Sequence, residues 1–224
     1  MTTTFSTSQA DALAIDVDRE HGGLRLSMIA IFIGLWILVF AITNSLIPSA
    51  GFNIIAGLVA FVVAAVGGRL LEPILKERWP SGRVVQVDTD GVQLRFRGST
   101  QEHVRSNEAV SALLWRFKID RRSRVPKGWY VVACALEQDD RFLAVYTFAS
   151  PDNMTALSKL AKFSDLMSDK ATKNARQDSL RIAGEQRRLR LAEQHRWNDG
   201  AEMSYEEFTR YIERLNAQFP QWLP

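Results

Sequence analysis

The sequence predicts an α+β membrane protein, in which two apolar helices precede a small antiparallel β domain and a helical tail. The 43 residues from Leu26 to Gly68 contain no Asp, Glu, Lys or Arg, whereas charge is dense from Arg69 onward. From Ser81 apolar and polar residues alternate, which is typical of half-buried strands. From Ser150 the apolar residues recur at helical spacing.

The uncharged run is too long for one helix, which would rise about 65 Å and cross the hydrocarbon core of a bilayer about twice over. Pro48 and Gly51 divide it into two blocks, each of about 20 residues and sufficient for one crossing. We therefore expect a transmembrane hairpin over 27–72, with helices 27–47 and 53–72. The acidic residues of the polar tail 1–26 argue against a signal peptide.

The cations indicate the orientation of this hairpin. The turn between the blocks has none, whereas cations flank both outer ends: Arg19, Arg25, Arg69, Lys76, Arg78 and Arg83. The positive-inside rule then predicts an integral membrane protein with both termini cytoplasmic.

Small residues recur every fourth position in the second block, at Ala56, Ala60, Ala64 and Gly68, and the first block has Ala30 and Gly34 at the same spacing. Such ridges let helices approach closely in lipid. They either close the hairpin on itself or join two copies of the chain. Neither block contains an ionisable residue, which argues against ion or proton transport.

The segment 77–170 is expected to form a cytoplasmic β domain with a capping helix. Asp90-Gly91 predicts a tight hairpin turn, and three further strands are expected within 109–120, 128–138 and 141–149. Residues 98–110 are expected to be loop or helix. Ser150, followed by proline, is typical of a helix start, and apolar spacing extends this helix toward Met167.

The run "VPKGWYVVACALEQDDRFLAVYTFASPDN" and the order of elements over about 27–170 resemble bacterial membrane-anchored proteins with a pleckstrin-homology-like (PH-like) domain. The run is similar to the paired late strands and following helix of such domains, which usually have seven strands. The resemblance implies an interaction or lipid-surface module at the bacterial inner membrane, and it implies no catalytic residues.

The tail 171–224 is expected to contain two helices. Residues 173–197 form a polar, basic helix, and Ser204 with Glu207 has the spacing of a capping box that starts the second. Phe219 and Trp222 near the C-terminus are expected to dock back on the domain, because exposed aromatic residues are unusual at loose termini.

No motif predicts a reaction. Cys134, the single cysteine, lies in a strand-like run and is expected to be a buried structural thiol. The histidines His21, His103 and His195 have no partner at metal-ligand spacing, and acidic residues near 88–90 and 139–140 fit turns. We therefore expect no catalytic residue, no metal and no cofactor.

The most basic short segment contains Lys118, Arg121, Arg122, Arg124 and Lys127. One interpretation is a loop that binds anionic lipid headgroups, with Arg95, Arg97 and Arg116 extending the patch. The other is a solvated turn. Nucleic acid is not expected, because base-stacking aromatics are not interleaved with these cations.

The favoured hypothesis is a non-enzymatic, membrane-anchored module that contacts lipid headgroups or a protein partner at the cytoplasmic surface. The alternative is an accessory or assembly subunit of a larger membrane complex, with a protein partner or a second copy as its neighbour. An enzyme acting at the membrane surface ranks last.

Overall fold

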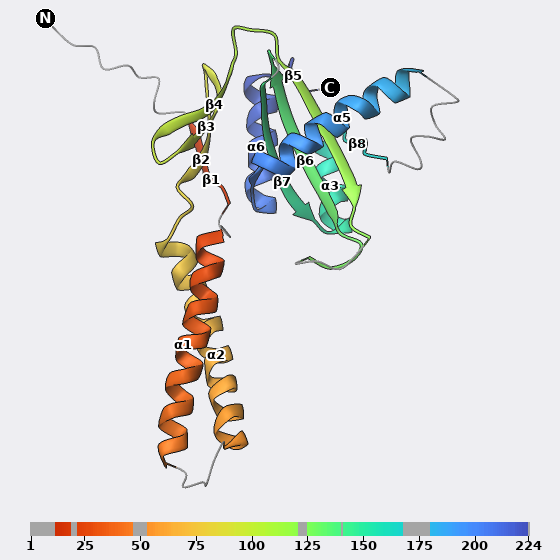
Figure 1. Ribbon diagram of the computed structural model, residues 1–224. Helices are drawn as coiled ribbons and strands as arrows, with labels where there is room; N and C mark the ends of the chain where they lie inside the picture. Colours follow the sequence, from red (N-terminus) through yellow and green to blue (C-terminus); the bar gives the residue numbers. More distant parts are fainter. Residues whose placement is uncertain are drawn as a thin grey trace, which may run out of the picture. The chain divides into compact units, whose positions relative to one another are not determined.

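The computed structural model describes residues 12–18, 22–46, 53–120, 125–139, 141–167 and 180–223, except for the side chains of Glu77 and Leu180. These residues form two compact units (Figure 1). Unit 1 combines Met1–Asp18 with Gly82–Pro224, and unit 2 is Arg19–Ser81. The α+β class is confirmed by two long apolar helices near the N-terminus, followed by antiparallel and mixed sheets with further helices.

Unit 2 is a helical hairpin of α1 (Gly22–Leu46) and α2 (Ile54–Arg78), both long and apolar enough to cross a membrane. Asn53 caps α2, because its side-chain oxygen accepts from Ile55 N at 3.0 Å and Ala56 N at 3.2 Å. Helix α1 begins five residues before its expected start at 27, and α2 ends six residues after its expected end at 72. Helix α2 continues past Pro73, where Lys76 pairs with Glu72 at 2.8 Å. The expected turn at Pro48 and Gly51 lies outside the described residues.

The first sheet of unit 1 is antiparallel, in the order β1-β2-β3-β4, with bounds Leu13–Asp16, Arg83–Asp88, Gly91–Phe96 and Ser99–Arg105. The predicted turn is confirmed, since Asp88 Oδ1 accepts from Asp90 N and Gly91 N at 3.0 and 3.1 Å. The expectation of loop or helix over 98–110 is wrong for β4. This edge strand is polar and buries only Val104, so it lacks the alternation that usually indicates a strand.

Strand β1 lies in the segment expected to be a polar tail. It pairs with β2, although α1 and α2 lie between the two strands in the sequence. Leu13 is opposite Val87, and Asp16 is opposite Val84. Ile15 and Val17 are buried in the core. Unit 2 is therefore inserted between two neighbouring strands of one sheet, and it does not simply precede the domain.

The second sheet has the order β8-β5-β6-β7-β9. Its long antiparallel strands are β5 (Ser111–Lys118), β6 (Tyr130–Gln138) and β7 (Arg141–Ala149). The two-residue strands β8 (Ser164–Asp165) and β9 (Ala201–Glu202) pair in parallel at the two edges. They cover backbone groups that an open sheet edge would otherwise expose.

Helices cover both faces of this second sheet (Figure 1). One face carries α3 (Pro151–Leu160) and α6 (Tyr205–Gln218), and the other carries α5 (Leu180–Asp199). Ser150 caps α3, which ends at Leu160 and does not reach Met167. Residues 173–179 of the predicted tail helix lie outside the described residues, and α5 runs two residues past its predicted end at 197.

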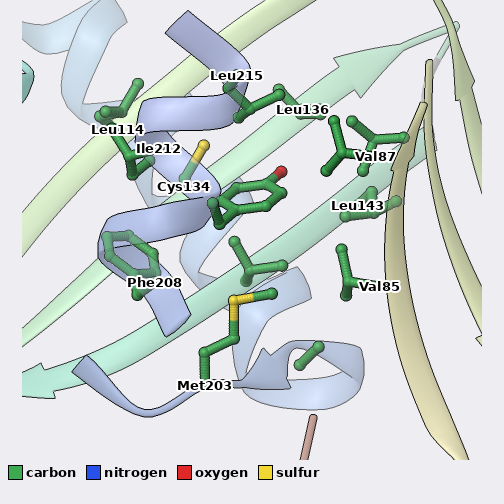
Figure 2. Packing of buried hydrophobic residues seen from close by; sticks show 14 of the residues in the cluster. Val85, Val87, Leu114, Cys134, Leu136, Leu143, Met203, Phe208, Ile212 and Leu215 are labelled. Carbon is green, nitrogen blue, oxygen red and sulfur yellow. The ribbon is translucent and has the colours of Figure 1, made fainter. Parts of the chain in front are cut away.

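Helix α6 fills the core of unit 1, where its side chains face strands of both sheets (Figure 2). It begins with the predicted capping box, in which Ser204 and Glu207 each accept from the other's backbone N–H. Its apolar residues Phe208, Tyr211, Ile212 and Leu215 are fully buried. Phe219 and Trp222 are also buried, with their rings stacked 4.0 Å apart. The aromatic C-terminus therefore docks on unit 1.

Candidate membrane-binding site

The contact between α1 and α2 involves the small residues of α2. Ala56, Ala60 and Ala64 are fully buried, and Gly68 is buried as well. The two helices approach each other closely at Gly67, where a Cβ would lie only 2.7 Å from Leu35 Cδ2. Ala56, Ala60 and Ala64 of the predicted ridge are thus covered within the hairpin, whereas nothing lies within 4 Å of a Cβ built on Gly68.

The small residues of α1 lie elsewhere. Ala30 and Gly34 are on the exposed face of α1, and nothing lies within 4 Å of a Cβ built on Gly34. They do not take part in the contact with α2. Spacing alone did not reveal this, because it gives the period of a ridge and not the side of the helix that meets a partner.

The chain passes between the two units after Asp18 and before Gly82, and these points lie side by side. Val17 N donates to Arg83 O at 3.0 Å, and the Arg83 guanidinium pairs with the Asp18 carboxylate. Asp18 also binds β9, because its Oδ1 accepts from Glu202 N at 2.9 Å and its own N donates to Glu202 O at 2.8 Å. Arg83 Nη2 donates to Asp199 O at 2.8 Å. One cluster therefore fixes both ends of the hairpin insertion to α5 and β9.

The basic segment Lys118–Lys127 lies between β5 and β6. Ile119 N donates to Trp129 O at 2.7 Å and Gly128 N to Ile119 O at 2.9 Å, so pairing continues beyond the two strands. Lys118 and Lys127 are exposed. Arg121, Arg122 and Arg124 lie outside the described residues. The described cations are thus carried by the end of a strand hairpin.

This end of the second sheet lies at the end of unit 1 where β1 ends and β2 begins (Figure 1). The hydrogen bonds at the opposite end of unit 1 agree with this placement of the Lys118 end. Gln138, at the other end of β6, bonds to Arg105, which ends β4 away from Arg83. Within unit 1, the Lys118 end of β5 is therefore the end of the second sheet away from Gln138 and Arg105.

The three arginines expected to extend the patch have other partners. Arg95 donates to Gln86 Oε1 and Gly98 O, and Arg97 lies over the Phe96 ring. Arg116 Nε donates to Asp165 Oδ1 at 2.7 Å, and this hydrogen bond raises the pKa of the Arg116 guanidinium. Arg116 thus holds β8 against β5.

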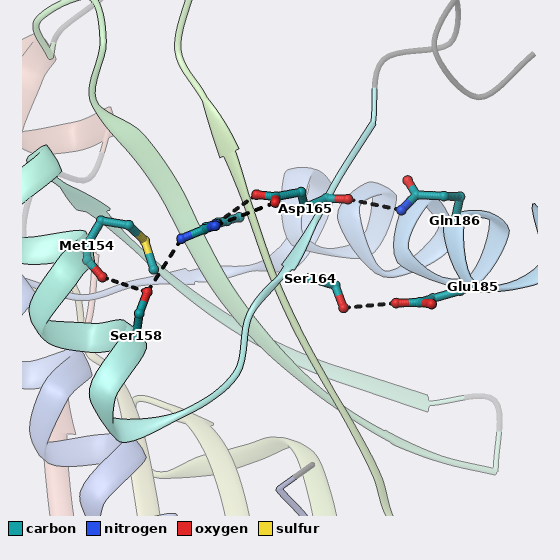
Figure 3. A network of polar contacts seen from close by, with 7 residues as sticks. Met154, Ser158, Ser164, Asp165, Glu185 and Gln186 are labelled. Carbon is teal, nitrogen blue, oxygen red and sulfur yellow. Dashed lines mark hydrogen bonds and ion pairs between the residues drawn. The ribbon is translucent and has the colours of Figure 1, made fainter. Parts of the chain in front are cut away.

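Polar contacts also attach β8 to α5 (Figure 3). Gln186 Nε2 donates to Asp165 O at 3.0 Å, and Gln186 Oε1 accepts from Met167 N at 2.9 Å. Ser164 Oγ donates to Glu185 Oε1 at 2.9 Å. Gln186 is buried, and this network positions α5 on the sheet.

Sequence reasoning did not single out Trp197, which is 78% exposed near the end of α5. The neighbouring Arg196 is only 6% exposed and stacks over the Tyr146 ring at 4.7 Å. Glu193 accepts from Arg196 Nη2 at 2.6 Å and from Trp115 Nε1 at 2.9 Å. A rigid support thus holds an exposed tryptophan two residues before Asp199, which contacts Arg83. In the sequence, Trp197 could have been noticed as the single tryptophan of a polar, basic helix.

The described residues offer little for catalysis. Burial raises the pKa of the Cys134 thiol to about 12, and a thiol that stays protonated is a poor nucleophile. His195 stacks on Phe142 at 4.4 Å, whereas His21 lies outside the described residues. Within the described ranges, no three His, Cys, Asp or Glu side chains are grouped to hold a metal ion.

Fold and site together define an α+β chain with two apolar helices and a cationic strand hairpin at one end of its β unit. Comparison with protein-family models, with curated proteins and with solved structures finds no match for this chain.

Proposed function

We propose that this chain is a non-enzymatic, membrane-anchored module, in which α1 and α2 cross the membrane and unit 1 contacts anionic lipid headgroups at the cytoplasmic surface. The observation that carries the proposal is the insertion of the hairpin between β1 and β2. It attaches unit 1 to unit 2 by two chain connections at one end, and the Lys118 end of β5 lies at that same end.

Membrane crossing is supported by the length and apolarity of both helices. Apolar side chains cover most of their outer surfaces, including Ile29, Ile33, Ile37, Leu58, Val62 and Val66, all exposed within unit 2. Such a surface is stable in lipid but costly in water. The flanking cations favour an inner-membrane protein with both termini cytoplasmic.

A PH-like identity for unit 1 is supported by its strand order. In the described residues, β1 to β7 supply seven strands in two sheets, and α3 follows β7 directly. Strands β2 to β7 and α3 lie within the residues 27–170 that the resemblance covers, whereas β1 precedes them. In our proposal α5 and α6 are additions to these elements.

Lipid contact is supported by charge and by one aromatic side chain. Cations close to an anionic leaflet each contribute about 1 kcal/mol, and the basic segment has five of them. Trp197 is attached to the same end of unit 1 through Asp199 and Arg83. Tryptophan favours the headgroup level of a bilayer, where its ring is partly buried and its N–H stays hydrated.

The test uses the full chain in nanodiscs of neutral phosphatidylcholine, with and without phosphatidylglycerol. Hydrogen exchange of the amides in 118–130 is measured in both. We expect slower exchange with the anionic lipid. Salt, or the triple change Arg121→Glu, Arg122→Glu and Arg124→Glu, should return the exchange rate to its value in neutral lipid. The control is Arg105→Glu with Arg141→Glu, two exposed cations away from this end. Equal exchange in both lipids would contradict lipid contact and favour a protein partner.

A second candidate is a subunit of a larger membrane complex. The observation that favours it is the exposed position of Ala30 and Gly34 on α1, where a further helix would pack closely in lipid. Co-purification at fixed stoichiometry in mild detergent, lost in Gly34→Leu, would support this candidate over the first.

A further inference from the structure

A cavity of about 260 Å³ lies within unit 2, where α1 begins and α2 nears its end. Its lining is Leu24, Arg25, Met28, Ile29, Glu72 and Lys76. Both helices therefore supply a cation to one space that also has an apolar wall. The small-residue contacts of the hairpin lie outside this lining.

The cavity has a defined level along the hairpin. Arg25 directly precedes the uncharged run, and Glu72 lies one helical turn after its end at Gly68. If the uncharged run spans the hydrocarbon core, these charged groups lie in the headgroup layer, where lipid phosphates are found. Met28 and Ile29 line the cavity and lie within the uncharged run.

The charges suit a monoanion. Lys76 Nζ lies 2.8 Å from Glu72 Oε1, which fixes the ammonium group at the cavity. Among the described lining residues, Arg25, Lys76 and Glu72 together carry a formal charge of +1. A guanidinium offers paired donors to phosphate oxygens, and an ammonium adds a compact positive charge.

We propose that this cavity binds the phosphodiester headgroup of one membrane phospholipid, with Arg25 and Lys76 on the phosphate and Leu24, Met28 and Ile29 along the glycerol and first acyl carbons. The inference rests on the proposed function in one respect, the crossing of the membrane by α1 and α2. It does not depend on the basic segment Lys118–Lys127.

Native mass spectrometry of the full chain in neutral detergent tests this assignment, with phosphatidylglycerol, diacylglycerol or inorganic phosphate added in turn. We expect one phosphatidylglycerol per chain and no retention of the other two. Arg25→Gln with Lys76→Gln should weaken binding about thirtyfold, at about fivefold for each cation. Arg78→Gln removes a cation of the same helix outside the lining and should leave binding unchanged. Lys76→Gln alone removes one cation of the lining and should weaken binding about fivefold.

Diacylglycerol bound as tightly as phosphatidylglycerol would overturn the role of the phosphate, and retained inorganic phosphate would overturn the lipid assignment. Equal loss in the Arg78 variant would show diffuse attraction in place of a site. Resistance of the full chain to alkaline extraction from membranes reports on crossing itself. An extraction-resistant chain whose Arg25 and Lys76 variant binds normally would overturn this inference alone.

Discussion

Gln138 joins the two sheets of unit 1 by bonding to the backbone of Arg105 in the manner of a neighbouring strand. Its side-chain Oε1 accepts from Arg105 N at 2.9 Å, and its Nε2 donates to Arg105 O at 3.0 Å. Gln138 is only 5% exposed. The amide therefore gives the end of β4 two partners in the other sheet.

Removing this amide should destabilise unit 1. We expect Gln138→Ala to lower the free energy of unfolding by about 1–3 kcal/mol, because two backbone groups lose their partners in a largely buried position. Chemical unfolding of the full chain in detergent measures the change. Gln101→Ala, at an exposed position of β4, should stay within about 0.5 kcal/mol of the parent chain. Equal effects of the two changes would contradict the joining role of Gln138.

The insertion of the hairpin gives a second prediction. A chain in which 12–18 is joined to 82–224 by a short glycine-serine linker should fold as a soluble domain, because Val17 N and Arg83 O already meet. A chain of 77–224 lacks β1 and with it the burial of Ile15 and Val17, each of which contributes about 1.5–3 kcal/mol. Urea unfolding should show a lower midpoint for 77–224. Equal midpoints would mean that β1 is dispensable.

The two faces of the hairpin give a third prediction, through the same substitution at two positions. Ala60→Leu adds volume to the α1–α2 contact and should cost about 1–3 kcal/mol. Ala30→Leu lies on the exposed face and should change hairpin stability by less than about 0.5 kcal/mol. Thermal unfolding in detergent separates them. A larger loss for Ala30→Leu would place the contact on the other side of α1.

The buried thiol gives a pH dependence. Burial raises the pKa of Cys134 from 9.0 to about 12, so the folded chain keeps a proton that the unfolded chain releases. Its contribution to stability is complete below pH 9.0 and falls as the pH rises toward 12, by up to about 1.4 kcal/mol per pH unit. Burial also raises the pKa of Tyr211, which acts in the same direction.

Urea unfolding of the linked domain at several pH values between 9 and 12 measures this slope. Cys134→Ala should be less stable at neutral pH, because a buried group is removed, yet it should lose less stability as the pH rises. Identical slopes for the two chains would show that the thiol titrates as freely in the folded state as in the unfolded one.

The sequence predicted the elements that depend on residues close to one another in the chain. The Asp90-Gly91 turn, the cap at Ser150 and the Ser204–Glu207 capping box lie where the sequence indicated, because each depends on neighbouring residues. The two long helices were equally predictable, because each is apolar over almost its whole length.

Elements that depend on distant partners were not predictable in this way. Strand β1 has four residues and takes its register from β2, across the inserted hairpin. Strand β4 is polar because it lies at a sheet edge, and only Val104 marks its inner face. The candidate site was unpredictable for the same reason. Arg116 does not extend the cationic segment because it bonds to Asp165, which lies 49 residues further along the chain.

We propose that the hairpin inserted between β1 and β2 crosses the membrane twice and leaves unit 1 in the cytoplasm. Cysteine accessibility tests it directly, since buried Cys134 gives little background. Ser45→Cys is placed at the exposed end of α1, and Asn107→Cys in an exposed turn of unit 1. An impermeant maleimide applied to intact bacterial spheroplasts should label Ser45→Cys alone, and Asn107→Cys should react only after permeabilisation. Labelling of both positions from the same side would contradict the account.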